Sequence, residues 1–293
     1  MKTLALPKGS RAEDRPGLWP GVALAGAVVA AFALYAPVIP GLVEDWWSHA
    51  EYSHGFAVPV VAAYLAWRRR HEAAAAPMDG SWAGLLLFLA GVGLYAVGAW
   101  AFEPFVMRVS LPIVLAGAVW FVGGSGFMKP LAFPLAYLVF MIPLPYPIFK
   151  TLALGLRYLD AEIAAAVLTR LQVPVLQDGY FLHLPRITLE VADGCSGLFS
   201  IVSLLAVGAL YAHLTLNGFW RRLVILLAII PVAVGVNILR IVIIAWVSHV
   251  SGDWIFMVTF KTFTGIFNFL LSGLVIVALG QWLSGLGRKR RPA

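Results

Sequence analysis

The sequence predicts an all-α polytopic membrane protein with about eight transmembrane helices, a short β-like hairpin and an amphipathic helix on its outer face. Of its 293 residues, 61% are hydrophobic and only 12% are charged, whereas soluble domains carry about 45–50% and about 25%. Apolar stretches long enough to cross a bilayer recur along the chain. The basic residues behind the net charge of +7 cluster beside these stretches, which is typical of membrane topology and not of nucleic-acid binding. This composition excludes a soluble enzyme, a disordered chain and a coiled coil.

The predicted spans follow one another without an internal repeat or a low-complexity linker. The first apolar stretch is long enough to span and shows no cleavage site, so we expect it to stay in the protein. We therefore expect one integral membrane domain over residues 1–293, with cytoplasmic tails at 1–17 and 285–293. The expected spans cover residues 18–40, 55–67, 82–102, 105–122, 130–149, 197–214, 223–247 and 263–283.

The basic residues also set the expected orientation. If the chain has about eight spans and a cytoplasmic N-terminus, every basic group falls on the cytoplasmic side, as the positive-inside rule requires. These groups are residues 2–15, 68–70, 129, 221–222 and 288–291. The same topology places three segments outside, 44–54, 150–195 and 249–262, which together hold nine of the 14 acidic residues.

The long outer segment, 150–195, divides into two parts. Residues 151–171 predict a helix with one apolar face, which favours an amphipathic helix lying on the bilayer surface. Its other face carries Arg157, Asp160, Glu162 and Arg170. Residues 181–184 and 186–191 then alternate apolar and polar side chains around Pro185, which predicts a hairpin or two short strands.

Cys195 is the only cysteine of the chain, so neither an intramolecular disulfide nor a cysteine-based metal cluster can form. It stands where the strand-like segment leads into the sixth span. The N-terminus of a helix favours a thiolate there, and Gly194 and Gly197 permit a tight turn. Cys195 is therefore a candidate nucleophile; the alternative is an inert buried thiol.

Arg240 lies inside the seventh span, where a charge costs at least a few kcal/mol and normally faces a partner or a polar cavity. Asn237 precedes it by three residues and shares its helix face. Snorkelling to the interface is the alternative. On the sixth span, Ser196, Ser200 and Ser203 share one face; helix packing is the expected role of that face, and substrate contact is the alternative.

Three further residues on the expected outer side are candidates. Lys261 begins the eighth span and is followed by a polar stripe of Thr264, Gly265, Asn268 and Ser272, which fits either a functional cation or an interfacial anchor with a packing face. His249 could act as a base, but nine helical residues turn it away from Arg240. His54 stands where the second span enters the membrane.

Together these segments resemble the exosortase/archaeosortase family of membrane-embedded cysteine transpeptidases. The sequence YSHGF at 52–56 is similar to the N-terminal signature of the family, DGCSGL at 193–198 to its cysteine motif, and NILRI at 237–241 to its arginine motif. The resemblance covers about residues 40–285, and the motifs are specific in combination.

The resemblance implies a multi-pass protein of the bacterial inner membrane whose active site faces the periplasm. Its partners would be exported proteins with a C-terminal PEP-CTERM-type tail and a lipid or glycan acceptor, in association with exopolysaccharide. Cys195 would be the nucleophile that forms a thioester, and Arg240 the proton donor or oxyanion stabiliser. Apart from the resemblance, Ser196, Asn237 and His54 are candidates for contact with substrate.

The third position of the family pattern differs in this chain. Exosortases typically place a histidine four residues before a glycine at the start of the last span, and here Lys261 precedes Gly265. A lysine can stabilise an oxyanion as a point charge, but it is a poor base at neutral pH unless desolvated. Either Cys195, Arg240 and Lys261 form the site, or activity is impaired.

Two other function classes remain open. One is a non-enzymatic scaffold or transporter in polysaccharide export, although the polar groups gather at outer span ends and not at the midplane. The other is an inactive relative that binds sorting signals without cutting them. The sequence holds no nucleotide-binding or His-Glu metal motif, so we expect no cofactor, no metal and no nucleic-acid partner.

Overall fold

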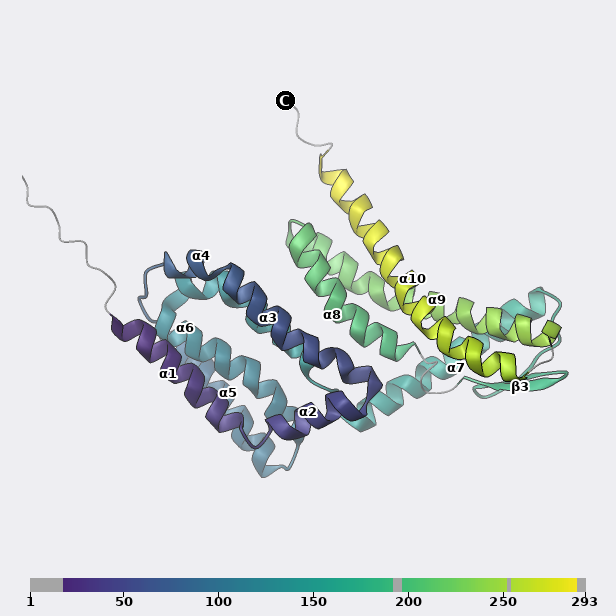
Figure 1. Ribbon diagram of the computed structural model, residues 1–293, viewed down its shortest axis with the longest axis horizontal. Helices are drawn as coiled ribbons and strands as arrows, with labels where there is room; N and C mark the ends of the chain where they lie inside the picture. The colour runs from purple at the N-terminus through teal and green to yellow at the C-terminus, as the bar shows by residue number, and fades with distance from the viewer. Residues whose placement is uncertain (1–17, 192–196, 252–253, 289–293) are drawn as a thin grey trace, which may run out of the picture. The chain divides into compact units, whose positions relative to one another are not determined.

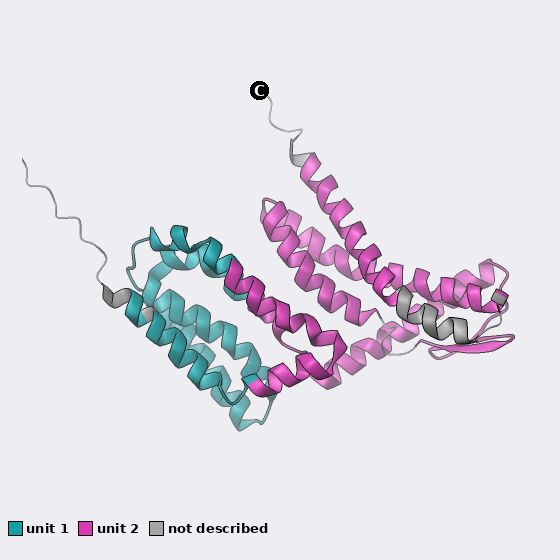
Figure 2. Ribbon diagram, in the orientation of Figure 1, with its two compact units in different colours: residues 1–39, 65–136 teal, residues 40–64, 137–293 magenta. Residues whose placement is uncertain are grey.

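The computed structural model describes residues 18–191, 197–251 and 254–288. They form helices almost throughout, with one small sheet (Figure 1). The chain divides into two compact units, residues 1–39 with 65–136 and residues 40–64 with 137–293 (Figure 2).

The first unit is built from α1 (Leu18–Tyr35), the end of α3 (Ala57–Arg68), α4 (Arg70–Ala74), α5 (Trp82–Trp100) and α6 (Pro104–Tyr137). Glycines spaced by seven residues let α5 lie close to α6. A Cβ at Gly84 would lie 2.2 Å from the backbone N of Phe121, and one at Gly91 would lie 2.8 Å from Cγ2 of Val114. Small residues at such contacts are a common means of packing helices in membranes.

The second unit contains α2 (Ile39–Ser48), η1 (Ala50–Phe56), the start of α3, η2 (Leu138–Met141), α7 (Tyr146–Arg170), α8 (Leu198–Thr215), α9 (Phe219–Ser251) and α10 (Trp254–Arg288). Buried side chains of α8, α9 and α10 form one core; they include Leu204, Ile229 and Ile276. A second core joins α7 and the sheet to the end of α9.

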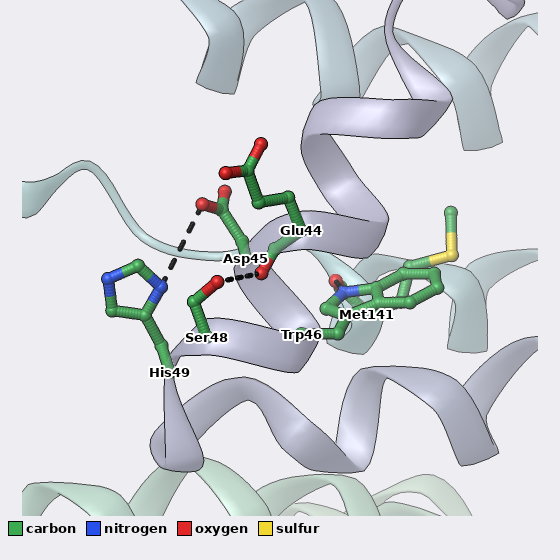
Figure 3. A network of polar contacts seen from close by, with 6 residues as sticks. All are labelled: Glu44, Asp45, Trp46, Ser48, His49 and Met141. Carbon is green, nitrogen blue, oxygen red and sulfur yellow. Dashed lines mark hydrogen bonds and ion pairs between the residues drawn. The ribbon is translucent and has the colours of Figure 1, made fainter.

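The start of the second unit is fastened to η2 by a side chain of α2. Figure 3 shows the indole of Trp46 directed at the backbone of Met141; its Nε1 donates to that carbonyl over 2.7 Å. On another side of α2, Ser48 donates to the carbonyl of Glu44 over 2.8 Å, and His49 lies 3.9 Å from a carboxylate oxygen of Asp45. The tryptophan therefore faces protein while the polar side chains face away from that contact.

The sheet has the antiparallel order β1 (Leu176–Asp178), β2 (Phe181–Leu184) and β3 (Ile187–Glu190). Leu184 pairs with Ile187 across the turn that contains Pro185, which confirms the predicted hairpin; β1 is an additional strand. In β2, Leu182 and Leu184 are buried and Phe181 and His183 are not, as the alternation predicts. The sheet packs on α7 and on α9.

The expected count of about eight spans is not confirmed. The described ranges contain five helices long and apolar enough to cross a membrane, or six if α1 and α2 are one broken span. At 12 residues, α3 is only about 18 Å long and cannot cross a hydrocarbon core of about 30 Å. The expected span 105–122 and residues 130–141 of the expected span 130–149 fall within one continuous stretch, α6 with η2, in which Gly124 has a non-helical backbone (φ 73°, ψ 179°).

The span expected at 130–149 was too long, and the segment expected outside at 249–262 is largely helical. The span expected to end at residue 149 ends at Met141, and α7 begins at Tyr146 as a separate helix, because prolines at 143, 145 and 147 prevent a continuous helix. The outer segment expected at 249–262 is largely helical, since α9 reaches Ser251 and α10 begins at Trp254. At about 50 Å, these two helices are longer than the hydrocarbon core of a bilayer is thick.

Candidate functional site

The predicted site residues that the structure describes belong to the second unit. Cys195 and Ser196 lie outside the described residues, which resume at Gly197. The described residues on either side of that gap are Val191, which follows β3, and Gly197, which precedes α8. What holds these two residues therefore determines how the cysteine motif is attached to the fold.

Asn237 and Arg240 form the centre of the described site. They stand one turn apart on α9, so both project from one side of it. A Cβ at Gly197 would lie 3.4 Å from Cβ of Asn237, and a Cβ at Gly265 would lie 3.7 Å from Nη2 of Arg240. One turn of α9 thus contacts the end of the cysteine motif on α8 and the polar stripe of α10.

Asp160 of α7 holds Asn237 from the opposite side. Its Oδ2 accepts a hydrogen bond of 2.8 Å from Nδ2 of Asn237, and both side chains are buried. Burial raises the pKa of Asp160 to about 7, and the hydrogen bond from Asn237 opposes part of that shift. The carboxyl is therefore a proton-carrying group at neutral pH.

Arg157 lies one turn before Asp160 and holds the other side of the cysteine motif. Its Nε donates to the carbonyl of Val191, and its Nη2 donates to Oε1 of Glu190 over 2.8 Å. Its guanidinium carbon stands 3.7 Å from the ring centroid of Tyr180. An arginine that uses both its donors and its face in this way is fixed in position.

The burial of Arg157 and Asp160 corrects the expectation for this helix. The sequence placed both on the polar face of an amphipathic helix, together with Glu162 and Arg170. Only Glu162 and Arg170 are exposed. Sequence reasoning therefore missed Arg157 and Asp160 as members of the site. The sequence feature that could have indicated this burial is the run of small residues beside Asp160. Small residues mark close helix contacts, and Ala161 and Ala164 pack against α9.

The serines of α8 and the polar stripe of α10 face one another or the N-terminal motif. Ser200 accepts a hydrogen bond of 3.4 Å from Nδ2 of Asn268, and Ser272 is fully buried. Ser203 and His54 lie 3.4 Å apart. These contacts support the packing role expected for the face of Ser200 and Ser203.

His54 braces η1 against its neighbours. Its Nε2 lies 3.2 Å from the carbonyl of Phe140, and its Nδ1 lies 3.4 Å from Oγ of Ser203. Burial lowers the pKa of His54, so the imidazole is neutral at pH 7. Gly55 lets the indole of Trp46 pack directly on the backbone, since a Cβ there would lie 2.2 Å from its Nε1.

The two alternative third residues have different positions. His249 lies on the same unbroken helix as Arg240, so the nine residues between them amount to about half a turn around the axis. Lys261 belongs to the helical backbone of α10, four residues before Gly265; its side chain lies outside the described residues. The structure therefore brings Gly197, Asn237, Arg240 and Gly265 together, and His249 is half a turn away.

Comparison with known proteins agrees with this arrangement. The family model of transmembrane exosortases (Exosortase_EpsH) matches residues 46–278, a range that includes the N-terminal, cysteine and arginine motifs and the start of α10. Searches of curated proteins and of solved structures found no match. Because the family model spans most of the chain and all of these motifs, the protein belongs to the transmembrane exosortase family.

Proposed function

We propose that this exosortase is a cysteine-dependent peptidase and transpeptidase that cuts C-terminal PEP-CTERM-type sorting signals of exported proteins at the outer face of the membrane. The observation that carries the proposal is the turn of α9 at Asn237–Arg240. Asn237 contacts Gly197, two residues after Cys195 in the chain, and Arg240 contacts Gly265 of α10. Gly197 of the cysteine motif and Gly265 of the third position, far apart in sequence, thus both lie beside one turn of α9.

In the proposed reaction, the thiolate of Cys195 attacks the scissile carbonyl carbon, and the carbonyl oxygen becomes an oxyanion. The tetrahedral intermediate collapses, the C–N bond breaks, and the amine leaves with a proton as a thioester forms. A nucleophilic acceptor, a lipid or a glycan, then attacks the thioester and restores the thiol. Water in place of the acceptor gives hydrolysis.

Arg240 is assigned to the oxyanion. A guanidinium does not give up its proton in a protein, so stabilising developing negative charge is a better role for it than donating a proton. Its position within an apolar helix strengthens such an interaction, because the local dielectric constant is low. Lys261 lies one turn before Gly265 on α10. We assign it as a second cation that stabilises the same oxyanion.

The proposal is tested with a reporter that carries the tripartite sorting tail, co-expressed with each variant. We expect Cys195→Ala to abolish processing while the variant stays in the membrane. Arg240→Lys should also be severe, because lysine loses the planar fork. Arg170→Lys is the matched control, since Arg170 is an exposed arginine of the same unit, and it should process normally.

A trapping experiment identifies the intermediate. Mass spectrometry of the peptide that contains Cys195 should show a reporter-derived acyl group that hydroxylamine releases, because thioesters react with hydroxylamine. Normal processing by Cys195→Ala would overturn the proposal in favour of a scaffold in polysaccharide export. Reporter binding without a cut or an acyl group would identify an inactive relative that only binds sorting signals.

A further inference from the structure

Two charged residues of α7 are buried one helical turn apart, beside the two ends of the cysteine motif. Arg157 is 7% exposed and Asp160 is 0% exposed. Among the side chains that the structure describes, which exclude that of Lys261, these are the only charged ones that are buried. Burying a charge is costly unless it is paired and hydrogen-bonded, so the contacts of these two side chains deserve a functional explanation.

Arg157 fixes the end at which the sheet leads into the motif. The last pair of the ladder joins Phe181 to Glu190, so Val191 lies beyond β3. Its N–H donates to the carbonyl of Tyr180 over 3.1 Å, and its own carbonyl accepts from Arg157. Arg157 also lies over the ring of Tyr180. One guanidinium therefore contacts both Val191 and Tyr180, the residue that accepts the hydrogen bond from the N–H of Val191.

Asp160 fixes the end at which the motif leads into α8. It binds Asn237, and Asn237 packs on Gly197. Gly197 has a left-handed backbone (φ 70°) and precedes the first turn of α8 without a side-chain cap. That conformation costs little only for glycine, and a Cβ at Gly197 would lie 3.4 Å from Cβ of Asn237, so the side chain of Asn237 lies beside this backbone.

We propose that Arg157 and Asp160 are positioning residues for the nucleophile, Arg157 through Val191 and Asp160 through Asn237 and Gly197. This inference rests on the proposed function of Cys195. Only five residues, 192–196, separate Val191 from Gly197 in the sequence, and Cys195 is one of them. A nucleophile that is already held in the reactive geometry loses little conformational entropy when it attacks, whereas a mobile nucleophile loses more.

The two attachments are tested separately by hydrogen exchange of the full-length protein in detergent. Arg157→Ala should accelerate exchange of the Val191 amide by about 10-fold or more, because its hydrogen-bonded neighbour Tyr180 is released. Asp160→Ala should instead accelerate exchange of the Ile201 amide, which donates to the carbonyl of Gly197 over 2.9 Å. Glu162→Ala is the control on the exposed face of α7 and should change neither.

Alkylation of the single thiol reports on Cys195 without requiring a substrate. The rate of reaction with iodoacetamide, measured against pH, should change in Arg157→Ala and in Asp160→Ala but not in Glu162→Ala. Asp160→Asn keeps an oxygen that accepts from Asn237, so it should restore both exchange and alkylation toward the wild-type values. A variant that is merely unfolded would instead accelerate exchange throughout α8 and α9.

Turnover of the tailed reporter links the positions to the reaction. We expect kcat to fall by about 10²-fold in Arg157→Ala and Asp160→Ala, with KM within about twofold. Asp160→Ala combined with Asn237→Ala should be no worse than the more severe single variant, because both act along one path.

Two results would overturn the inference. One is that Arg157→Ala and Asp160→Ala both exchange hydrogen and react with iodoacetamide at the wild-type rates. The other is that the losses of kcat caused by Asp160→Ala and Asn237→Ala multiply when the two substitutions are combined. Neither depends on cleavage. If wild type does not cut the reporter while exchange and alkylation change as described, the proposed function fails and the attachment of the motif to α7 stands.

Discussion

Asp160 and Arg240 illustrate two ways in which single residues place charge among apolar helices. A carboxyl can bind a proton and become neutral, whereas a guanidinium keeps its charge. Asp160 is fully buried and its pKa is raised to about 7. Arg240 is only half-buried, and its side chain passes Gly265, where no side chain obstructs it. The neutralisable group is thus suited to holding structure, and the permanent cation to binding negative charge.

The raised pKa of Asp160 predicts a specific dependence of stability on pH. Its folded pKa is about 7 against an ordinary value of 3.8, so between these values the unfolded carboxyl ionises while the folded one stays protonated. The folded state therefore loses stability as pH rises through this window. Asp160→Asn cannot ionise, so its melting temperature relative to wild type should increase from pH 5 to pH 8.

Intrinsic fluorescence of the 11 tryptophans measures this melting temperature in detergent. Glu162→Gln, on the exposed face of the same helix, is the control and should show no such trend. A difference between Asp160→Asn and wild type that stays constant from pH 5 to pH 8 would mean that Asp160 does not change its protonation over this range.

The third residue of the site is tested by a set of single variants. If Lys261 stabilises the oxyanion, Lys261→Ala should lower turnover of the reporter by about 10²–10³, the usual loss for one such donor. Lys261→His should keep or raise activity, because an imidazole can serve as donor and base and the family commonly places histidine there. His249→Ala should matter little, since α9 is unbroken between Arg240 and His249.

Loss of the uncut reporter band scores all three variants in one experiment. If Lys261→Ala processes the reporter normally while His249→Ala does not process it, the base is His249. An inactive wild type that Lys261→His restores would mean that lysine at this position has switched the enzyme off.

At the scale of elements, the contact between α5 and α6 depends on the absence of side chains. Gly84, Gly91 and Gly98 are buried along α5, and Gly117 of α6 lies against Phe88 of α5. Gly93 of the same helix has nothing within 4 Å of a built Cβ. The glycines that face α6 are therefore packing residues, and Gly93 offers a matched comparison.

We predict that Gly84→Ala destabilises the protein and that Gly93→Ala does not. The new methyl group at 84 would meet the backbone of Phe121, which cannot move aside as a flexible side chain can. Overpacking of this kind costs about 1–3 kcal/mol, and we expect a melting temperature several degrees lower. Equal melting temperatures of the two variants would show that α5 and α6 are not held this closely.

Local patterns predicted some elements and missed others for physical reasons. Alternation around Pro185 predicted β2 and β3, because strand faces are set by adjacent residues. The start of α10 was missed because Lys261 was taken to mark the edge of the membrane, although the helix begins at Trp254. The short α3 was predicted as a span because apolar composition does not reveal where a helix ends.

At the scale of the whole molecule, the described residues of the candidate site all come from the second unit, residues 40–64 and 137–293. The pairing of Asn237 with Arg240 could be predicted, since it needs only helical spacing. The pairing of Asp160 with Asn237 could not, because 77 residues separate them and no local pattern records such a contact. Membership of the family, by contrast, was visible in the motifs alone.

The last prediction concerns the sidedness of the whole chain. The basic groups at both ends and at residues 68–70 and 221–222 favour cytoplasmic termini and an outer-facing cysteine motif. A membrane-impermeant maleimide should therefore label Cys195, the only thiol, in intact spheroplasts. Asp178→Cys in a Cys195→Ser background provides a second outer probe, since Asp178 is an exposed residue of β1. Thr3→Cys in the same background should react only after the membrane is opened. Labelling of Thr3→Cys from outside, with Asp178→Cys protected, would reverse the orientation and place the proposed reaction on the wrong side for exported substrates.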